Sequence, residues 1–167
     1  MRNFWGISIV ALALACGSKN VKPGGGGDDT PAWLAQGTGA FNAESGKKLQ
    51  GVGSVPRSEP RARRQAADAA AAAQLQGGID AMAASLSKMT ESTKENVGDE
   101  IASILKKAAA ATPHVRDHYV ADGTENALDQ IDLSALKQAV QAGDGDDNLK
   151  KEIVNNLDRA FDQLQPK

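Results

Sequence analysis

The spacing of apolar residues changes several times along the chain, and each change predicts a new element of secondary structure. Over residues 47–56, Leu49, Val52 and Val55 form a short apolar run that ends at Pro56, so this segment is predicted to be a strand. Gly51 and Gly53 within it indicate a bulge or a place where another part of the backbone approaches closely.

The segment before this strand, residues 31–41, shows no regular period. It is expected to be an irregular lead-in whose Trp33 and Phe41 dock on the core. Aromatic residues make up only 4% of the chain, so we expect a core of aliphatic side chains and a modest stability. Residues 31–167 have the length of one domain.

A helical period follows the strand. Residues 61–74 are rich in alanine, which favours helix formation, and apolar residues then recur every three or four positions. They are Leu75, Ile79, Met82, Leu86 and Met89. Gly77 and Gly78 interrupt this stripe at a cost of ~1 kcal/mol each relative to alanine, so a kink or break is expected there.

A second helix is predicted to begin at a capping box, with Ser92 as N-cap and Glu95 three residues later. It should end near Ala111, because Pro113 cannot continue a helix. Its inner face is formed by apolar residues at helical spacing, namely Val97, Ile101, Ile104, Leu105 and Ala108.

The period then changes to two. Residues 114–133 form two alternating segments on either side of Asp122 and Gly123. An Asp-Gly dipeptide between two alternating runs predicts a β-hairpin.

Two further helices are predicted after the hairpin. Ser134 should cap a short helix through Ala142 that ends at Gly143, and the last helix should cover residues 147–164. The apolar face of the last helix comprises Leu149, Ile153, Leu157, Ala160, Phe161 and Leu164. The order of strand, two helices, hairpin and two helices predicts an α+β fold, with helices packed on one face of a small antiparallel sheet.

The beginning of the chain predicts a targeting segment. Residues 4–15 form a long apolar run behind the cation Arg2, and they are too few to cross a hydrocarbon core of ~30 Å as a helix. Residues 1–15 are therefore predicted to be a secretory signal peptide. Residues 12–16, Leu-Ala-Leu-Ala-Cys, resemble a bacterial lipobox, in which the cysteine becomes the acylated first residue. The alternative is an ordinary signal peptide that contains a cysteine.

Acylation of Cys16 would leave no free thiol for a disulfide, because the chain has one cysteine. Two or more acyl chains anchor a protein stably, since each buried methylene contributes ~0.8 kcal/mol. The glycine-rich residues 16–30 are predicted to be a flexible tether, and a chain of this length spans ~20 Å on average. Gly17 stands where an aspartate would favour retention in the inner membrane, so an outer-membrane location is expected.

The charge balance argues against nucleic acid as a partner. The whole chain has a formal net charge of −2, and without residues 1–15, which carry only Arg2, the net charge is −3. Binding to a phosphate backbone requires a strong excess of basic residues.

Two histidines have a spacing that would suit zinc on a helix, His114 and His118. Four residues of a strand span ~13 Å, whereas a zinc ion requires both nitrogens at ~2 Å. Because the alternating pattern predicts a strand here, we expect two surface histidines on a sheet face and no metal site.

Asp144, Asp146 and Asn148 share the first spacings of a calcium loop, but Leu149 and Asn155 occupy the positions that need glycine and glutamate. These acidic residues are therefore expected to cap the last helix. The glycine pairs at 37 and 39 and at 51 and 53 lack the third glycine of a dinucleotide loop, and turn geometry is expected to explain them.

One basic cluster lies at the predicted start of the long helix and comprises Arg57, Arg61, Arg63 and Arg64. The helix dipole disfavours cations at this position, so their presence calls for an explanation. One interpretation is a solvated face on which Arg64 pairs with Asp68. The other is an interaction patch for lipid head groups, an acidic partner or cell-wall anions.

Several segments together resemble the Lpp-twenty family of small bacterial lipoproteins. They are the cysteine at 16, the segment PAWLAQGTGAF at 31–41, GKKLQGVGSV at 46–55 before the alanine- and arginine-rich helix, and VRDHYVADGTENALDQIDL at 115–133. The family usually has aromatic residues at the places of Gln50 and Asn126. These two changes are expected to remove packing and any ligand recognition by those aromatics.

The resemblance implies a lipid-anchored envelope protein without catalytic activity, and some relatives serve flagellar or outer-membrane assembly. The residues themselves offer no recognisable nucleophile turn, cofactor motif or metal motif. We therefore expect a non-enzymatic protein that binds the membrane through Cys16 and an envelope protein through its surface. The alternative is a small-ligand or envelope-polymer binding module that uses the uncovered face of the sheet, and a metal-dependent hydrolase is a more distant option.

Overall fold

The computed structural model describes residues 30–56, 60–90 and 96–165. Within these residues, four strands form one antiparallel sheet in the order β1-β2-β4-β3. They are β1 (Gly39–Ala43), β2 (Gly46–Pro56), β3 (His114–Ala121) and β4 (Thr124–Asp132). The helices are α1 (Ala32–Gln36), α2 (Pro60–Met89), α3 (Val97–Ala111), α4 (Leu133–Ala142) and α5 (Asp147–Asp162). The predicted α+β class with an antiparallel sheet is confirmed.

The predicted strand and hairpin are also confirmed, as β2 and the β3–β4 pair. Asp122 and Gly123 have φ angles of 50° and 75°, the left-handed conformation that the two central residues of a type I′ turn require. The turn therefore fixes the register in which Ala121 faces Thr124.

The lead-in prediction for residues 31–41 was wrong, because this segment contains α1 and the start of β1. Polar Asn42 and exposed Ala43 hide the alternation that would identify β1 as a strand. Trp33 is buried, but it lies against the sheet face opposite α2 and not in the main apolar core. Phe41 is half-buried.

The expected break at Gly77 and Gly78 does not occur, and α2 continues without interruption to Met89. A Cβ atom on Gly78 would lie 3.1 Å from Cδ1 of Leu49, so the glycine gives the side chain of a strand residue room beside the helix. Packing against the sheet thus offsets the low helix propensity of this position.

The N-cap of α4 differs from the prediction, and the N-cap predicted for α3 lies outside the described residues. The N-cap of α4 is Asp132, not Ser134, because β4 runs directly into the helix without a connecting loop. Ser92 and Glu95 lie outside the described residues, and α3 begins at Val97 after Asn96, which has a left-handed φ of 71°. The predicted cap of α5 is confirmed, since the side chain of Asp146 accepts a hydrogen bond from the Leu149 N–H at 2.9 Å.

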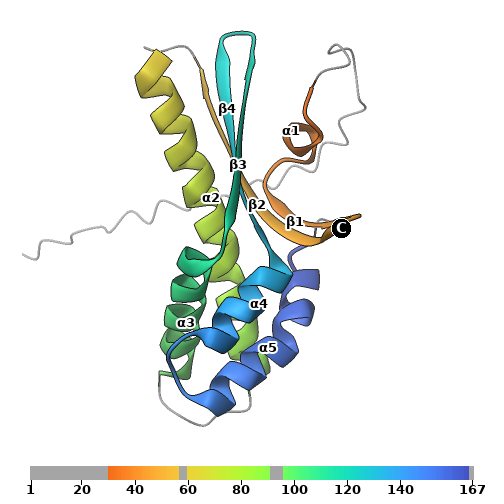
Figure 1. Cartoon of the computed structure of the whole chain (residues 1–167), viewed down its shortest axis with the longest axis vertical. Coiled ribbons are helices and arrows are strands. Elements are labelled where there is room, and N and C mark those ends of the chain that lie inside the picture. The colour runs from red at the N-terminus through yellow and green to blue at the C-terminus, as the bar shows by residue number, and fades with distance from the viewer. Residues whose placement is uncertain (1–29, 57–59, 91–95, 166–167) are drawn as a thin grey trace, which may run out of the picture.

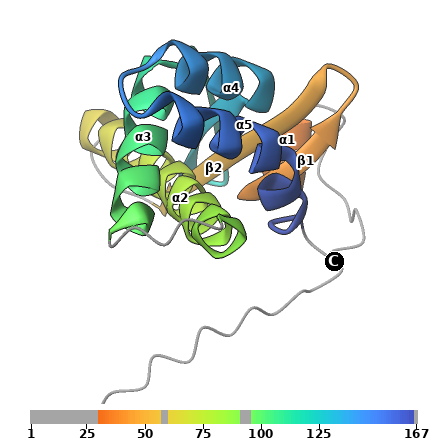
Figure 2. The ribbon, with the colours of Figure 1, turned by 90° about the horizontal axis from the view of Figure 1, so that it is seen from below.

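The long helix α2 connects two differently built ends of the molecule (Figure 1). Its first half packs on the sheet, and its second half packs with α3 and α5 beyond the end of the sheet. In the view from below, α4 and α5 lie over one side of this helical end while α2 and α3 lie on the other (Figure 2). We call the two parts the sheet end and the helical end.

The helical end holds the main apolar core. Its fully buried large side chains come from all four long helices and include Met82, Leu86, Ile101, Leu105, Leu136, Ile153, Leu157 and Phe161. The inner faces predicted for α3 and α5 are confirmed except at one end of each: Val97 and Leu164 are only partly buried, and α5 ends at Asp162, before the predicted residue 164.

The contact between α2 and the sheet is thin. A small separate cluster there consists of Ala67, Ala71 and Ala127, with Val55 packed against it. A Cβ atom on Gly53 would lie 2.5 Å from the backbone nitrogen of Ala71, and one on Gly51 would be closer than 3.0 Å to the Ala71 carbonyl oxygen. The interpretation of these glycines as a close backbone approach is therefore confirmed, and turn geometry does not explain them.

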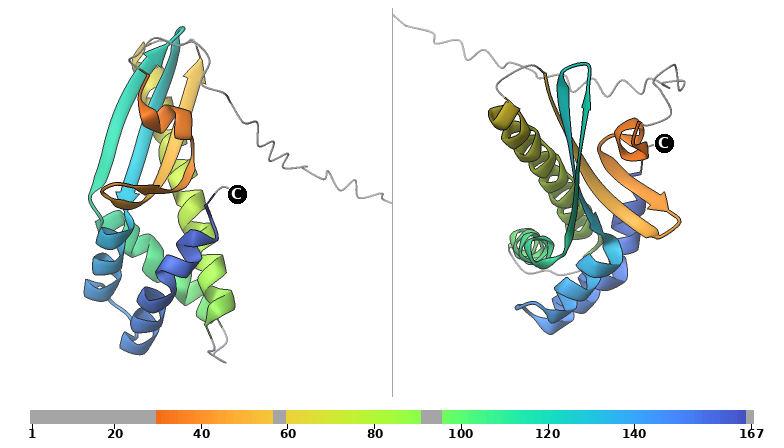
Figure 3. Two further views of the ribbon diagram at one scale, coloured as in Figure 1. Left: turned by 90° about the vertical axis from the view of Figure 1, so that its right-hand side faces the viewer. Right: turned by 45° about the horizontal axis from the view of Figure 1, so that its top comes forward.

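The other face of the sheet carries α1 (Figure 3, right). The indole Nε1 of Trp33 donates a hydrogen bond to Asp117 Oδ2 at 3.0 Å, and the side-chain amide of Gln50 donates to the carbonyls of Trp33 and Gly37. The Gln130 amide donates in turn to Gln50 Oε1 at 2.9 Å. Gln50 is 1% exposed, so these hydrogen bonds satisfy a fully buried amide.

Asn126 occupies the second position at which an aromatic was expected. Its Oδ1 accepts a hydrogen bond from Ser54 Oγ at 2.7 Å, and its Nδ2 donates to the Tyr119 carbonyl at 3.1 Å. This residue is also buried. Polar side chains thus tie neighbouring strands together on this face, which α1 covers in part.

Candidate functional site

A charged groove runs between α2 and the edge strand β3. One wall is the face of α2 that carries Arg61, Arg64, Asp68, Ala72 and Gln76, which follow one another at helical spacing. The other wall is the side of β3 that carries His114, Arg116, His118 and Val120, which alternate along the strand. Glu125 and Asp129 of β4 lie at its bottom. We call this the α2–β3 groove.

Glu125, which is 6% exposed, is the centre of the first charged cluster. Its carboxylate faces Arg63 Nε at 3.6 Å and His118 Nδ1 at 3.4 Å. These distances are long for hydrogen bonds, and both nitrogens are buried without a hydrogen-bond partner. The guanidinium of Arg63 also donates to the Gly123 carbonyl at 3.3 Å. Arg63 therefore ties α2 to the hairpin through an ion pair and a main-chain contact.

His118 links this cluster to α2 a second time. Its Nε2 lies 3.1 Å from Asp68 Oδ1 while its Nδ1 faces Glu125. Each ring nitrogen thus faces a carboxylate from a different element, so His118 of β3 lies between α2 and β4.

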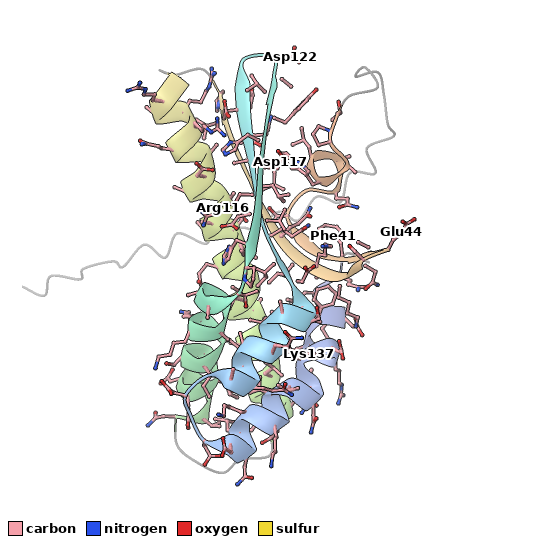
Figure 4. All side chains as sticks on the ribbon, in the orientation of Figure 1. Phe41, Glu44, Arg116, Asp117, Asp122 and Lys137 are labelled. Atoms are coloured by element: carbon pink, nitrogen blue, oxygen red, sulfur yellow. The ribbon has the colours of Figure 1, made fainter. Side chains whose placement is uncertain are left out.

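Asp129, which is 3% exposed, is the centre of the second cluster. Its Oδ1 lies 2.6 Å from His114 Nδ1 and 3.7 Å from Arg116 Nε. The other nitrogen of His114 lies 3.1 Å from the Ala109 carbonyl of α3. In the side-chain view, Arg116 lies on the α2 side of β3 and Asp117 on the α1 side (Figure 4). The two clusters repeat one arrangement, a buried carboxylate between a histidine and an arginine.

The groove widens into two hollows. The larger, of about 380 Å³, lies at the hairpin end between Arg61, Arg64, His118 and Val120. The smaller, of about 210 Å³, lies beside Gln76, Lys106, His114 and Arg116. Both are open at the surface, and cations form much of their rims.

The arginines of the predicted patch have different environments in the structure. Arg63 turns inward and is part of the Glu125 cluster. Arg61 and Arg64 are exposed at the larger hollow, and within residues 30–56, 60–90 and 96–165 neither has an ion-pair or hydrogen-bond partner. Asp68 pairs with His118, so the expected Arg64–Asp68 pair was wrong. Arg57 and Cys16 lie outside the described residues.

The strand predicted for the two histidines is confirmed, but they are not simply surface residues. Each is half-buried beside the helices and pairs with a carboxylate that is far away in sequence. Among the residues that the structure describes, no group of three or more His, Cys, Asp or Glu side chains is arranged to hold a metal ion. Sequence reasoning missed Glu125 and Asp129, whose only signal is that they alternate with Ala127 and Ile131 along one side of a predicted strand.

One carboxylate outside the groove has a clearly altered acidity. A hydrogen bond from Lys137, together with the charges of Lys137 and Lys47, lowers the pKa of Asp158, and partial burial opposes this effect. The pair joins α4 to α5 at the helical end, where Lys137 is labelled in Figure 4.

Comparisons of the chain with protein-family models, with curated proteins and with solved structures found no match. Within the described part of the chain, none of the helices has both the length and the hydropathy that crossing a bilayer demands.

Proposed function

We propose that the protein is a non-catalytic lipoprotein of the bacterial cell envelope, held at a membrane by acyl chains on Cys16. One observation carries the proposal: an apolar run at residues 4–15 leads directly to a single cysteine, and a glycine-rich segment then separates that cysteine from the folded part. A secretory signal, an acylation site and a spacer have this order. The residue after the cysteine, Gly17, favours the outer membrane.

The folded part acts through protein contacts in the assembly of envelope or surface structures. The free edge of β3 supports this proposal, because an edge strand presents unpaired backbone N–H and C=O groups that a partner strand can bind. Val115 on this strand is 50% exposed, and the neighbouring Arg116 adds a charge. The two buried carboxylates of the α2–β3 groove, Glu125 and Asp129, are each paired with an arginine, which suits a structural role better than acid–base catalysis.

Replacement of Cys16 tests the anchor. We expect Cys16→Ser to move the protein from the membrane fraction to the soluble fraction of its host, whereas Ser18→Ala, two residues away, should leave it in the membrane fraction. Mass spectrometry of the parent protein should find the cysteine at the mature N-terminus with diacylglycerol on its sulfur. Unchanged membrane association of the C16S variant, or a bare sulfur in the parent, would contradict the anchor.

Crosslinking in intact cells tests the protein contacts. A photoreactive amino acid at Val115 should capture the same envelope protein repeatedly, and one at the exposed Gln138 of α4 should not. If the two positions give the same background of products, β3 is not a partner surface and this part of the proposal fails.

A further inference from the structure

Helix α1, which begins two residues after the first described residue, lies in the same half of the molecule as the β3–β4 hairpin tip and the start of α2 (Figure 1). The N-terminal side of the folded part therefore belongs to the sheet end. If Cys16 is acylated, as proposed above, residues 17–30 connect this end to the bilayer. A glycine-rich chain of this length spans ~20 Å on average. The sheet end is then the part of the domain that stays within reach of the membrane surface.

This end presents two cations that have no ion-pair or hydrogen-bond partner among the residues that the structure describes. Arg61 and Arg64 are one helical turn apart and line the larger hollow, whereas Arg63 is held by Glu125 and the Gly123 carbonyl. The neighbouring carboxylates of Glu125 and Asp68 face Arg63 and His118, and Asp122 stands apart at the hairpin tip (Figure 4). Two unpaired guanidinium groups form a suitable site for phosphate oxygens, which accept paired N–H donors.

An apolar side chain accompanies these cations. Val120 lines the same hollow and is 53% exposed, although valine is usually buried. An exposed apolar group beside cations is typical of surfaces that rest at the boundary between lipid head groups and acyl chains.

The opposite end carries exposed carboxylates. Asp99 lies in the first turn of α3, and Asp144 lies in the connection between α4 and α5, which is far from the hairpin tip (Figure 1). Exposed lysines such as Lys107 and Lys151 stand among these carboxylates, so this end presents mixed charges to an anionic membrane, whereas Arg61 and Arg64 present two adjacent cations.

We propose that Arg61, Arg64 and Val120 form a membrane-contact surface that binds the phosphates of anionic phospholipids and turns the tethered domain so that its sheet end rests on the bilayer. Two arginines give weak binding to a membrane from free solution. Attachment through Cys16 raises the local concentration of lipid around the two arginines. The arginines therefore set the orientation of the domain, and the acyl chains anchor it. The helical end and the part of β3 near Val115 then stay accessible to a partner. This inference rests on the proposed function.

Energy transfer from two positions to the membrane tests the orientation. Because Cys16 is acylated in the lipidated protein, an introduced cysteine is the only free thiol and takes one donor dye. Ala62→Cys places the dye beside Arg61 on the exposed side of α2, and Asn148→Cys places it in the first turn of α5. The protein is reconstituted on vesicles of one part phosphatidylglycerol and two parts phosphatidylcholine that contain a lipid with an acceptor dye on its head group.

We expect energy transfer from position 62 to exceed that from position 148 by roughly twofold on these vesicles and to approach it on pure phosphatidylcholine. The double variant R61E/R64E should lose this difference, and V120S should reduce it. The control Lys151→Glu, an equal reversal of charge per residue on the exposed side of α5, should keep it.

Equal transfer from both positions in the parent protein, or an unchanged difference in R61E/R64E, would overturn the proposal. An acidic protein as the true ligand would give the first result, because the vesicles contain no such protein. A protein that does not associate with vesicles contradicts the anchor instead. The orientation is then measured on the C16S chain held by an N-terminal polyhistidine tag to nickel-chelating lipid.

Discussion

The sheet end and the helical end of this molecule are held together by different interactions. At the helical end, leucine, isoleucine, methionine and phenylalanine side chains from four helices are fully buried together. At the sheet end, α2 meets the strands through alanines and glycines, with the Glu125 and Asp129 clusters beside them. Because a buried leucine contributes ~1.5–3 kcal/mol and an alanine much less, most of the hydrophobic stabilisation comes from the helical end.

One helix shows the difference along its own length. The buried stripe of α2 begins with Ala67 and Ala71 and continues with Leu75, Ile79 and Met82. The small residues allow the helix backbone to touch β2, and ion pairs then hold the helix to the hairpin. Because the helical end supplies most of the hydrophobic stabilisation, the sheet end can carry an exposed strand edge and two arginines that have no partner among the described residues.

Truncation of a core side chain should show the contrast most strongly. Leu157→Ala removes a fully buried side chain from the helical end and should lower the free energy of unfolding by ~2–5 kcal/mol. Val55→Ala removes two methyl groups from the half-buried cluster of the sheet end and should cost ~1 kcal/mol. Urea denaturation followed by circular dichroism measures both, and equal losses would remove the contrast.

Replacing a glycine by alanine should destabilise the protein where β2 touches α2 and should stabilise it at an open position of α2. Gly53→Ala places a Cβ 2.5 Å from the Ala71 nitrogen and should cost ~1–3 kcal/mol, because the helix must move away from the strand. The control Gly77→Ala meets nothing within 4 Å and should stabilise the helix by ~1 kcal/mol. Thermal melting measures both variants. An unchanged melting temperature of G53A would contradict the close approach of α2 to β2.

Removal of the central charge of a cluster tests whether ion pairs hold the hairpin to α2. Glu125→Gln keeps the volume of the side chain but leaves Arg63 and His118 without their shared anion, and it should cost ~1–3 kcal/mol. The control Asp122→Asn changes an exposed carboxylate at the turn and should be nearly neutral. If E125Q matches D122N in denaturation experiments, the cluster contributes no stability.

The smallest effect concerns the exposed ion pair of the helical end. The hydrogen bond from Lys137 lowers the pKa of Asp158 below its ordinary value of 3.8 in the folded state, so the pair stabilises the protein above that pH. The contribution is lost as the pH falls through the lowered pKa. Because half of the Asp158 side chain is exposed, Asp158→Asn should cost only ~0.5 kcal/mol at pH 6. Melting temperatures should show the two proteins converging at acid pH, and a difference that grows with acid would refute the sign.

The elements with a strong local signal could be predicted from the sequence. The apolar stripe from Leu75 to Met89 predicts the second half of α2, and Asp122-Gly123 predicts the hairpin turn, because neighbouring residues decide both. Strand β1 and the unbroken α2 could not be predicted in this way. Gly78 is tolerated only because Leu49, a strand residue, packs beside it.

The candidate site was harder to predict for the same reason. The arginine patch was identified by its spacing, but the inward turn of Arg63 depends on Glu125, which lies on another element. The partners of His114 and His118 come from β4, α2 and α3, so no local window contains these clusters. Ion pairs between residues that are far apart in the sequence cannot be recognised from the spacing of residues in a single sequence.

Native-state hydrogen exchange tests the division between the two ends most directly. Amides of α5 and of the second half of α2 should exchange only through global unfolding, with the full free energy of the protein. Amides of β3 and of the first turns of α2 after Arg61 should exchange through a partial opening of lower free energy, and E125Q should lower it further. If both ends exchange with the same free energy and E125Q shifts them equally, the fold is a single cooperative unit and the account is wrong.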